Sequence, residues 1–187
     1  MRQRDPIHVA YHEAGHAVLF DAADVMVRWV ALDDDSIGGE CRCAYAGSIY
    51  DVESAFEHAT FALGGFLAEA RNRCLTGEDA RPWCEFLGWY ADRVEEDVDF
   101  VRSEIECGME DEDGLWGDAY DVHQCLLPIE NSGQYEGVRE CIEALLKYTS
   151  DAVDKNWPAI QAVAERLAAD HFLYGRDVRD IIAAARA

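Results

Sequence analysis

The sequence predicts a mostly α-helical fold with one small β-hairpin or sheet, in a single domain spanning residues 1–187. Three observations support this fold class. Apolar residues recur with helical spacing over most of the 187-residue chain. One short run, Val25 to Leu32, is instead rich in residues that favour strands. Half of the residues are hydrophobic, enough for a sizeable core.

The first elements of the chain are a helix followed by two strands. Pro6 is typical of the first turn of a helix, and the apolar pattern extends that helix to about Ala22. The strand at Val25–Leu32 leads into turn-forming residues at Asp33–Gly39, and Glu40–Ala46 can return as a second strand. The small β-element therefore comes directly after the first helix.

Helices dominate the rest of the chain. The longest, Asp51 to about Arg73, contains Gly64 and Gly65, which cost helix propensity and indicate that another backbone packs closely there. Gly15 in the first helix is the expected partner of this close contact. Residues 108–121 are acidic and contain glycine, so we expect an inserted loop. A further helix is expected to start between Gly88 and Asp92 and to run to about Cys107, and others are expected at residues 133–155, 157–170 and 177–187.

The charge balance excludes some partners. The chain has 16 Lys and Arg against 38 Asp and Glu, a formal net charge of −22. Such a surface repels phosphate backbones and anionic lipid, so we expect neither nucleic acid nor a membrane as a partner. No signal peptide or membrane-spanning run is visible. The seven cysteines are odd in number and form no C-x-x-C pair, which predicts reduced thiols in a cytoplasmic protein.

The motif with chemical content is H-E-x-x-H, formed by His12, Glu13 and His16 on the first helix. Residues four apart lie on one helical face, about 6 Å apart along the axis, so both imidazoles can bind one Zn²⁺. Glu13 is placed to act as the general base for a water that attacks a carbonyl group. The sequence therefore predicts a zinc cofactor and a hydrolytic reaction.

His8 continues the same series of histidines. It lies about 12 Å from His16 along the axis, too far for both to bind one zinc, so we expect His8 at the rim of the pocket or on the surface. A catalytic zinc site takes three protein ligands and keeps one position open. Spacing alone does not select the third ligand among the many acidic residues downstream.

Several segments resemble the peptidase domain of the FtsH-type zinc metallopeptidases, the proteolytic part of the membrane-bound AAA proteases. Residues 10–18, Ala-Tyr-His-Glu-Ala-Gly-His-Ala-Val, match the zinc helix of that family nearly letter for letter. Leu63–Ala70 with Thr76-Gly77 resembles its second helix, and residues 157–181 resemble its C-terminal helices. The resemblance thus touches most of the chain.

The resemblance implies roles for further residues. It places the third zinc ligand at Asp92, 76 residues after His16, with Asp97 and Asp99 as alternatives. Glu69 corresponds to the acidic residue of the family's Ala-Glu step. It is either a partner for a zinc-binding histidine or a buried structural partner of Arg71, Arg73 or a helix N-terminus. Peptidase domains of this family assemble as rings; for this chain a monomer and a homo-oligomer both remain open.

The chain lacks the family's ATPase and membrane segments. No G-x-x-x-x-G-K-[ST] motif is present, so we expect no ATP-driven unfolding. The leading hypothesis is an ATP-independent zinc metallopeptidase that cuts unfolded or extended polypeptides bound beside a sheet edge. The alternatives are a catalytically silent zinc-binding or interaction domain, and a regulatory protease that a partner activates.

Overall fold

The computed structural model describes all residues except 1–5, 34–37, 46, 48–50, 83 and 93–116. The described chain is mostly helical with a small three-stranded antiparallel sheet, which confirms the predicted fold class. Its residues group into two compact units. Unit 1 comprises residues 1–46, 64–80 and 150–187, and unit 2 comprises residues 47–63 and 81–149.

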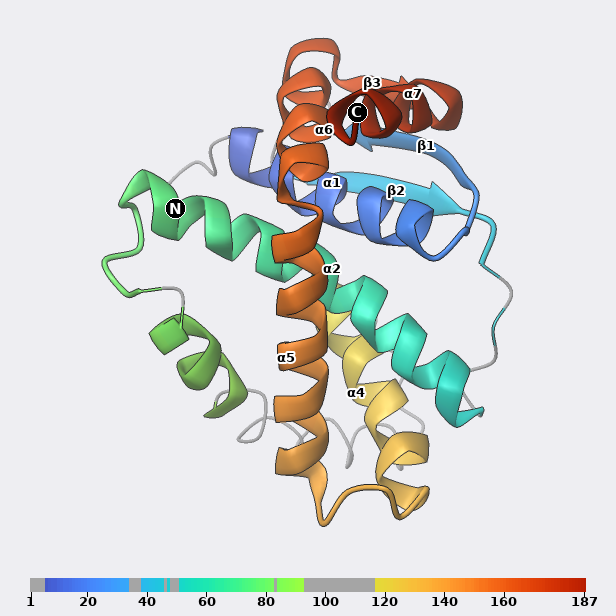
Figure 1. The fold of residues 1–187 in the computed structure, drawn as a ribbon, viewed down its shortest axis with the longest axis vertical. Coiled ribbons are helices and arrows are strands. Elements are labelled where there is room, and N and C mark those ends of the chain that lie inside the picture. The colour runs from blue at the N-terminus through green and yellow to red at the C-terminus, as the bar shows by residue number, and fades with distance from the viewer. Residues whose placement is uncertain (1–5, 34–37, 46, 48–50, 83, 93–116) are drawn as a thin grey trace. The chain divides into compact units, whose positions relative to one another are not determined.

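Helix α1 (Pro6–Ala22) is the centre of unit 1. It contacts β1 (Val27–Leu32), β2 (Gly39–Cys43), α6 (Trp157–Asp170) and α7 (Gly175–Ala185). Most of its residues between positions 8 and 19 are buried, as expected for a helix that is covered on all sides. Figure 1 shows α1 running beside the two long strands.

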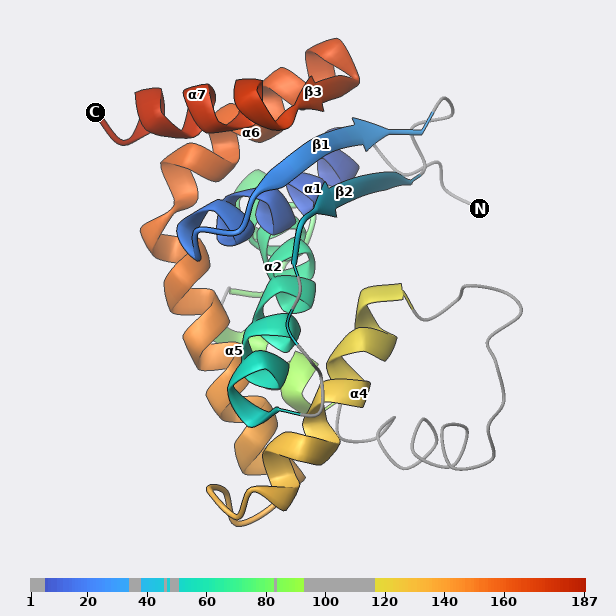
Figure 2. The same cartoon turned by 90° about the vertical axis from the view of Figure 1, so that its right-hand side faces the viewer.

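The sheet has the strand order β2-β1-β3, with β3 (Phe172–Tyr174) next to the central strand β1. Val30 of β1 and Leu173 of β3 are register partners, and both are buried. On the opposite face, the Trp29 ring stacks on Phe172 with the ring centroids 6.0 Å apart. Figure 2 shows β1 and β2 lying along α1, so the sheet places β2 at an edge near this helix.

Helix α2 (Val52–Thr76) brings its second half against α1 within unit 1. A Cβ atom added at Gly15 would lie 2.8 Å from the Cβ of Ala68 and 2.9 Å from the carbonyl carbon of Gly64. A Cβ atom at Gly64 would in turn lie 2.6 Å from a methyl group of Leu19. The close backbone contact predicted from these glycines is therefore confirmed.

Unit 2 contains α4 (Gly117–Asn131) and the first part of α5 (Val138–Lys155), besides a helical segment at residues 84–92. The sequence did not predict α4, and residues 117–121 were wrongly expected in a loop. Pro128 and several polar residues weaken the local helix signal. Burial at the helical spacing 122, 125, 126 and 129 nevertheless stabilises this helix in the fold.

Other predicted boundaries differ by smaller amounts. Strand β3 was not predicted, because three residues are too few to show strand alternation. Helix α5 begins at Val138 rather than residue 133, and α7 begins at Gly175. The rest of the helix expected at 88–107 and residues 108–116 of the expected insertion lie outside the described residues.

No described helix combines the length and the apolar character that crossing a membrane requires.

We expect Gly175→Ala to destabilise unit 1. The added Cβ would overlap the carbonyl oxygen of Val27 and lie 2.7 Å from its carbon, and strand backbone cannot give way as a flexible side chain can. Overpacking of this kind costs about 1–3 kcal/mol. The matched control is Gly88→Ala in a helical segment, where an added Cβ meets nothing within 4 Å and should be neutral or stabilise by about 0.5–1 kcal/mol. Urea denaturation measures both, and equal effects of the two substitutions would contradict the packing argument.

Candidate metal centre

The two motif histidines lie together on one face of α1. The centroids of the His12 and His16 rings are 4.8 Å apart, with the ring planes at 77°. The His12 side chain is 12% exposed, and His16 and Glu13 are 7% and 5% exposed. The three motif residues His12, Glu13 and His16 are therefore largely buried within unit 1.

Gly65 of α2 makes room for both rings. A Cβ at this position would overlap Nε2 of His16 and lie 2.9 Å from Cδ2 of His12. The next residue, Phe66, meets the His12 ring edge-on at a centroid distance of 5.1 Å. The histidines thus sit in a cradle that any side chain at position 65 would fill.

Glu69 is the acidic neighbour of the first histidine. Its Oε2 lies 3.3 Å from Nδ1 of His12, and its Oε1 accepts hydrogen bonds of 3.0 and 2.7 Å from Arg73. The Glu69 side chain is 7% exposed, and the two hydrogen bonds from Arg73, both to Oε1, hold it in place. A carboxylate beside Nδ1 favours the tautomer that presents Nε2 to a metal. The geometry accommodates both roles that the sequence left open for Glu69.

Glu13 lies beneath the edge strand. A Cβ at Gly39, the first residue of β2, would be 2.7 Å from Cγ and 3.1 Å from Cδ of Glu13. The glutamate therefore reaches the edge of the sheet because this strand position has no side chain. The sequence predicted Gly39 in the turn before this strand. In the structure Gly39 pairs with Leu32 of β1, and this strand pairing places it next to Glu13.

His8 is buried, with 2% of its surface exposed, so the expectation of a rim or surface position is wrong. The Asn72 side-chain amide donates to Nδ1 at 3.1 Å, and Nε2 donates to the Glu78 carboxylate at 2.8 Å. This assignment follows from the amide being the donor in the first pair. Both ring nitrogens are engaged, which explains how a histidine is accommodated in the core.

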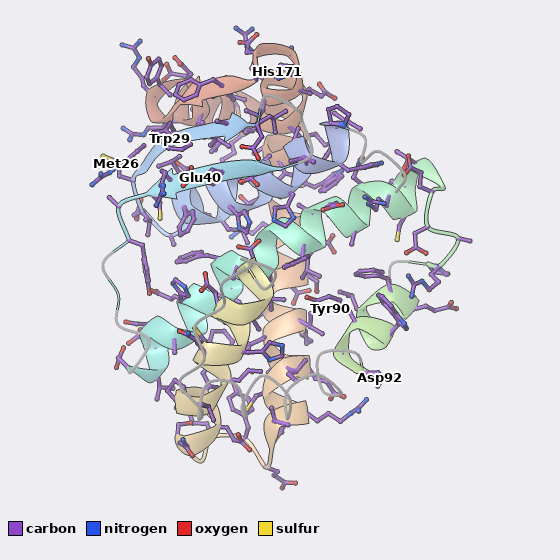
Figure 3. All side chains as sticks on the ribbon, turned by 180° about the vertical axis from the view of Figure 1, so that it is seen from behind. Met26, Trp29, Glu40, Tyr90, Asp92 and His171 are labelled. Carbon is purple, nitrogen blue, oxygen red and sulfur yellow. The ribbon has the colours of Figure 1, made fainter. Side chains whose placement is uncertain are left out.

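Asp92, the third ligand that the resemblance implies, belongs to unit 2. It is the last described residue of the helical segment that begins at residue 84, and it is labelled in Figure 3. Its carboxylate is 59% exposed and accepts a 2.6 Å hydrogen bond from Arg139. The alternatives Asp97 and Asp99 lie outside the described residues. Within the described part of unit 1, no further His, Cys, Asp or Glu joins His12 and His16 in a three-ligand group.

Comparison with known proteins adds no family assignment: no family model matches the chain, and no curated protein matches it significantly.

Sequence reasoning found the motif residues and Glu69 but missed how their neighbours are arranged. Gly65, Glu69 and Asn72 follow one another on α2 at spacings of four and three, and contact His16, His12 and His8 respectively. Both the three histidines and this second stripe recur at helical spacings of three or four residues, which the sequence shows. The partner of each histidine could have been proposed from these spacings once the glycines had aligned the helices.

We expect Gly65→Ala to weaken zinc binding by about tenfold or more, because the added Cβ displaces both imidazole rings. Isothermal titration with a competing chelator measures the affinity, and circular dichroism checks that the helices remain. Gly137→Ala is the control, since an added Cβ there meets nothing within 4 Å. Unchanged zinc affinity in the folded Gly65→Ala protein would show that the cradle does not position the ligands.

Proposed function

We propose that this protein is an ATP-independent zinc metallopeptidase that hydrolyses peptide bonds in unfolded or extended polypeptides. The observation that carries the proposal is the buried group formed by His12, Glu13 and His16 beside Glu69. It contains two imidazole ligands, a carboxylate for proton transfer and a carboxylate that orients one imidazole. These are the side chains that peptide hydrolysis at zinc requires.

The residues fit a zinc ion. Two imidazoles from one helical face are borderline-soft ligands of the kind that zinc prefers. The cradle at Gly65 leaves their rings unobstructed by any side chain from that position. Bound zinc would supply Lewis-acid polarisation and lower the pKa of a water molecule at this place.

The chain's own residues divide the remaining work. The Glu13 carboxylate takes a proton from the water that attacks the peptide carbonyl carbon, and delivers it to the amide nitrogen as the carbon–nitrogen bond breaks. The Glu69 carboxylate, 3.3 Å from Nδ1 of His12, is placed to orient that imidazole, and Arg73 holds Glu69. Burial of Glu13 limits competing contact with bulk water.

The substrate would lie along β2, the edge strand next to Glu13. Edge strands present backbone groups that can pair with an extended peptide, so recognition is independent of most side chains. The missing side chain at Gly39 lets this edge lie close to the carboxylate. This arrangement supports a polypeptide in extended form as the substrate.

We further propose a reducing, cytoplasmic environment. The described cysteines, at positions 41, 43, 74, 84, 125 and 141, are all free thiols. Burial raises the pKa of the Cys125 thiol to about 12, so it behaves as a core residue rather than a reactive one.

The third ligand is proposed to be a carboxylate, and unit 2 offers two described candidates. Asp92 has the support of the resemblance, but its carboxylate is exposed and paired with Arg139. Asp118, in the first turn of α4, is half-buried. The pKa of Tyr90 is raised mainly by burial of the phenol and further by the nearby negative charge of Asp118. Asp118 is the second candidate because its side chain is less exposed than that of Asp92.

We expect that removing the true ligand lowers zinc affinity by more than about 100-fold, beyond the effect typical of an outer partner. Asp92→Ala and Asp118→Ala should be compared by competitive zinc titration, with the exposed Asp151→Ala as control. Loss in Asp92→Ala alone supports the assignment by resemblance, and loss in Asp118→Ala alone moves the ligand to α4. If both variants keep wild-type affinity, neither Asp92 nor Asp118 is the third ligand.

We expect Glu13→Gln to abolish cleavage of an unfolded protein while leaving zinc binding within a fewfold of wild type, because the amide cannot accept the proton. Cleavage is followed by gel electrophoresis of a reduced, unfolded substrate, and zinc by metal analysis. Glu53→Gln, on the surface of α2, is the control. Cleavage retained in Glu13→Gln contradicts the mechanism. A wild-type protein that binds zinc but does not cleave supports the silent-domain or partner-activated alternatives.

A further inference from the structure

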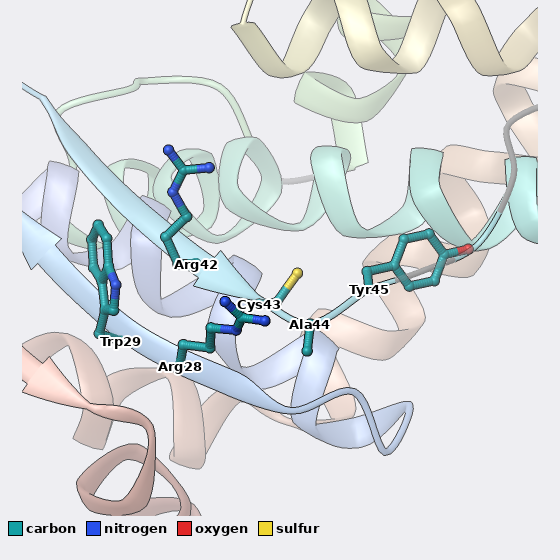
Figure 4. Close-up of a pocket in the computed structure, with 6 residues that line it drawn as sticks. All are labelled: Arg28, Trp29, Arg42, Cys43, Ala44 and Tyr45. Atoms are coloured by element: carbon teal, nitrogen blue, oxygen red, sulfur yellow. The ribbon is translucent and has the colours of Figure 1, made fainter.

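A groove of about 540 Å³ lies along the β1–β2 ribbon in unit 1, shown in Figure 4. It is lined by Arg28 and Trp29 of β1, Arg42 and Cys43 of β2, and the following Ala44 and Tyr45. The two arginines come from neighbouring strands, and the described residues that line the groove include no aspartate or glutamate. The groove is thus a cationic and aromatic site on a chain of net charge −22.

The guanidinium groups are available to a ligand. Arg28 is exposed and has no ion-pair partner among the residues whose positions are described. Arg42 pairs through Nε with Glu40, but Arg42 and Glu40 are 64% and 45% exposed. An ion pair exposed to this extent adds little stability, so an incoming carboxylate can compete with Glu40 for the guanidinium.

The lining selects one ligand chemistry. A guanidinium group binds a carboxylate through two parallel hydrogen bonds, which gives geometric specificity. The flat rings of Trp29 and Tyr45 provide apolar surface for the short stem that carries the carboxylate. An aspartate or glutamate side chain and a peptide C-terminus share this chemistry.

The groove lies at a defined distance along β2 from Glu13. Gly39 is next to Glu13, and Cys43, which lines the groove, follows four residues later. At about 3.3 Å per residue in a strand, the separation is about 13 Å. A peptide that lies extended on this edge with its scissile bond at Glu13 therefore has a residue about four positions away at the groove.

We propose that this groove is a substrate subsite that binds a carboxylate carried by the extended peptide, about four residues from the bond that is cleaved. The inference rests on the proposed peptidase function, because that function places an extended peptide along β2. It adds a substrate class: polypeptides with an acidic side chain, or a chain end, at this distance from the cut.

The experiment measures binding separately from cleavage. Fluorescein-labelled peptides are titrated by fluorescence anisotropy into zinc-loaded Glu13→Gln protein, which the proposed mechanism makes unable to turn over. One peptide carries an internal glutamate and an amidated C-terminus, and a second carries glutamine there. A third carries glutamine and a free C-terminal carboxylate. Cleavage of the same peptides by the protein with Glu13 intact tests the proposed function on its own.

We expect the glutamate or the free-carboxylate peptide to bind about tenfold more tightly than the amidated glutamine peptide, and the better of the two identifies the source. Arg28→Ala combined with Arg42→Ala should remove this preference. Arg166→Ala is the control, since Arg166 is 61% exposed and pairs with Asp170 much as Arg42 pairs with Glu40. The subsite is overturned if neither carboxylate improves binding, if the preference survives in the double variant, or if Arg166→Ala removes it equally.

Discussion

In unit 1 the backbones of α1 and α2 approach each other at Gly15 and Gly64, and the candidate metal centre depends on that approach. A side chain at Gly15 would meet Gly64 and Ala68, and one at Gly65 would meet both motif histidines. Two helices packed through larger residues lie 8–10 Å apart, which would separate Glu69 from the ring of His12. These glycines lower helix propensity, but they let the two helices come close enough for the Glu69 carboxylate to reach the imidazole of His12.

Burying so many polar groups on α1 requires a partner for each. His8 is held by Asn72 and Glu78, and Glu69 by Arg73. Aromatic contacts fix the outer face, where Tyr11 stacks on Trp157 at 5.4 Å and the Arg71 guanidinium lies 4.4 Å from the same indole. Burial raises the pKa of Tyr11, which therefore stays a neutral phenol. These contacts position α1 within unit 1, and a candidate site with two ligands on one helical face needs such positioning.

The sequence predicted those parts of the structure that local patterns determine. The helix with the motif, the close contact of Gly15 with Gly64, the first two strands and α6 all follow from spacing, glycine positions and Pro158 in the first turn of α6. Helix α4 and strand β3 did not follow, because the first contains Pro128 and the second has three residues. Tertiary burial stabilises both. The third candidate ligand could not be predicted from spacing. The chain has 38 Asp and Glu residues, so no single distance along the sequence from the motif is distinctive.

The roles of the three histidines on α1 follow from what α2 places opposite them. By sequence His8, His12 and His16 are equivalent members of an i, i+4, i+8 series. Asn72 and Glu78 occupy both nitrogens of His8, so this ring contributes to the core and cannot bind a metal. Glu69 faces one nitrogen of His12, and Gly65 places no side chain against the other two rings. The absent side chain at Gly65 and the amide of Asn72 on the neighbouring helix thus distinguish the two candidate ligands from the structural histidine, which the motif alone does not do.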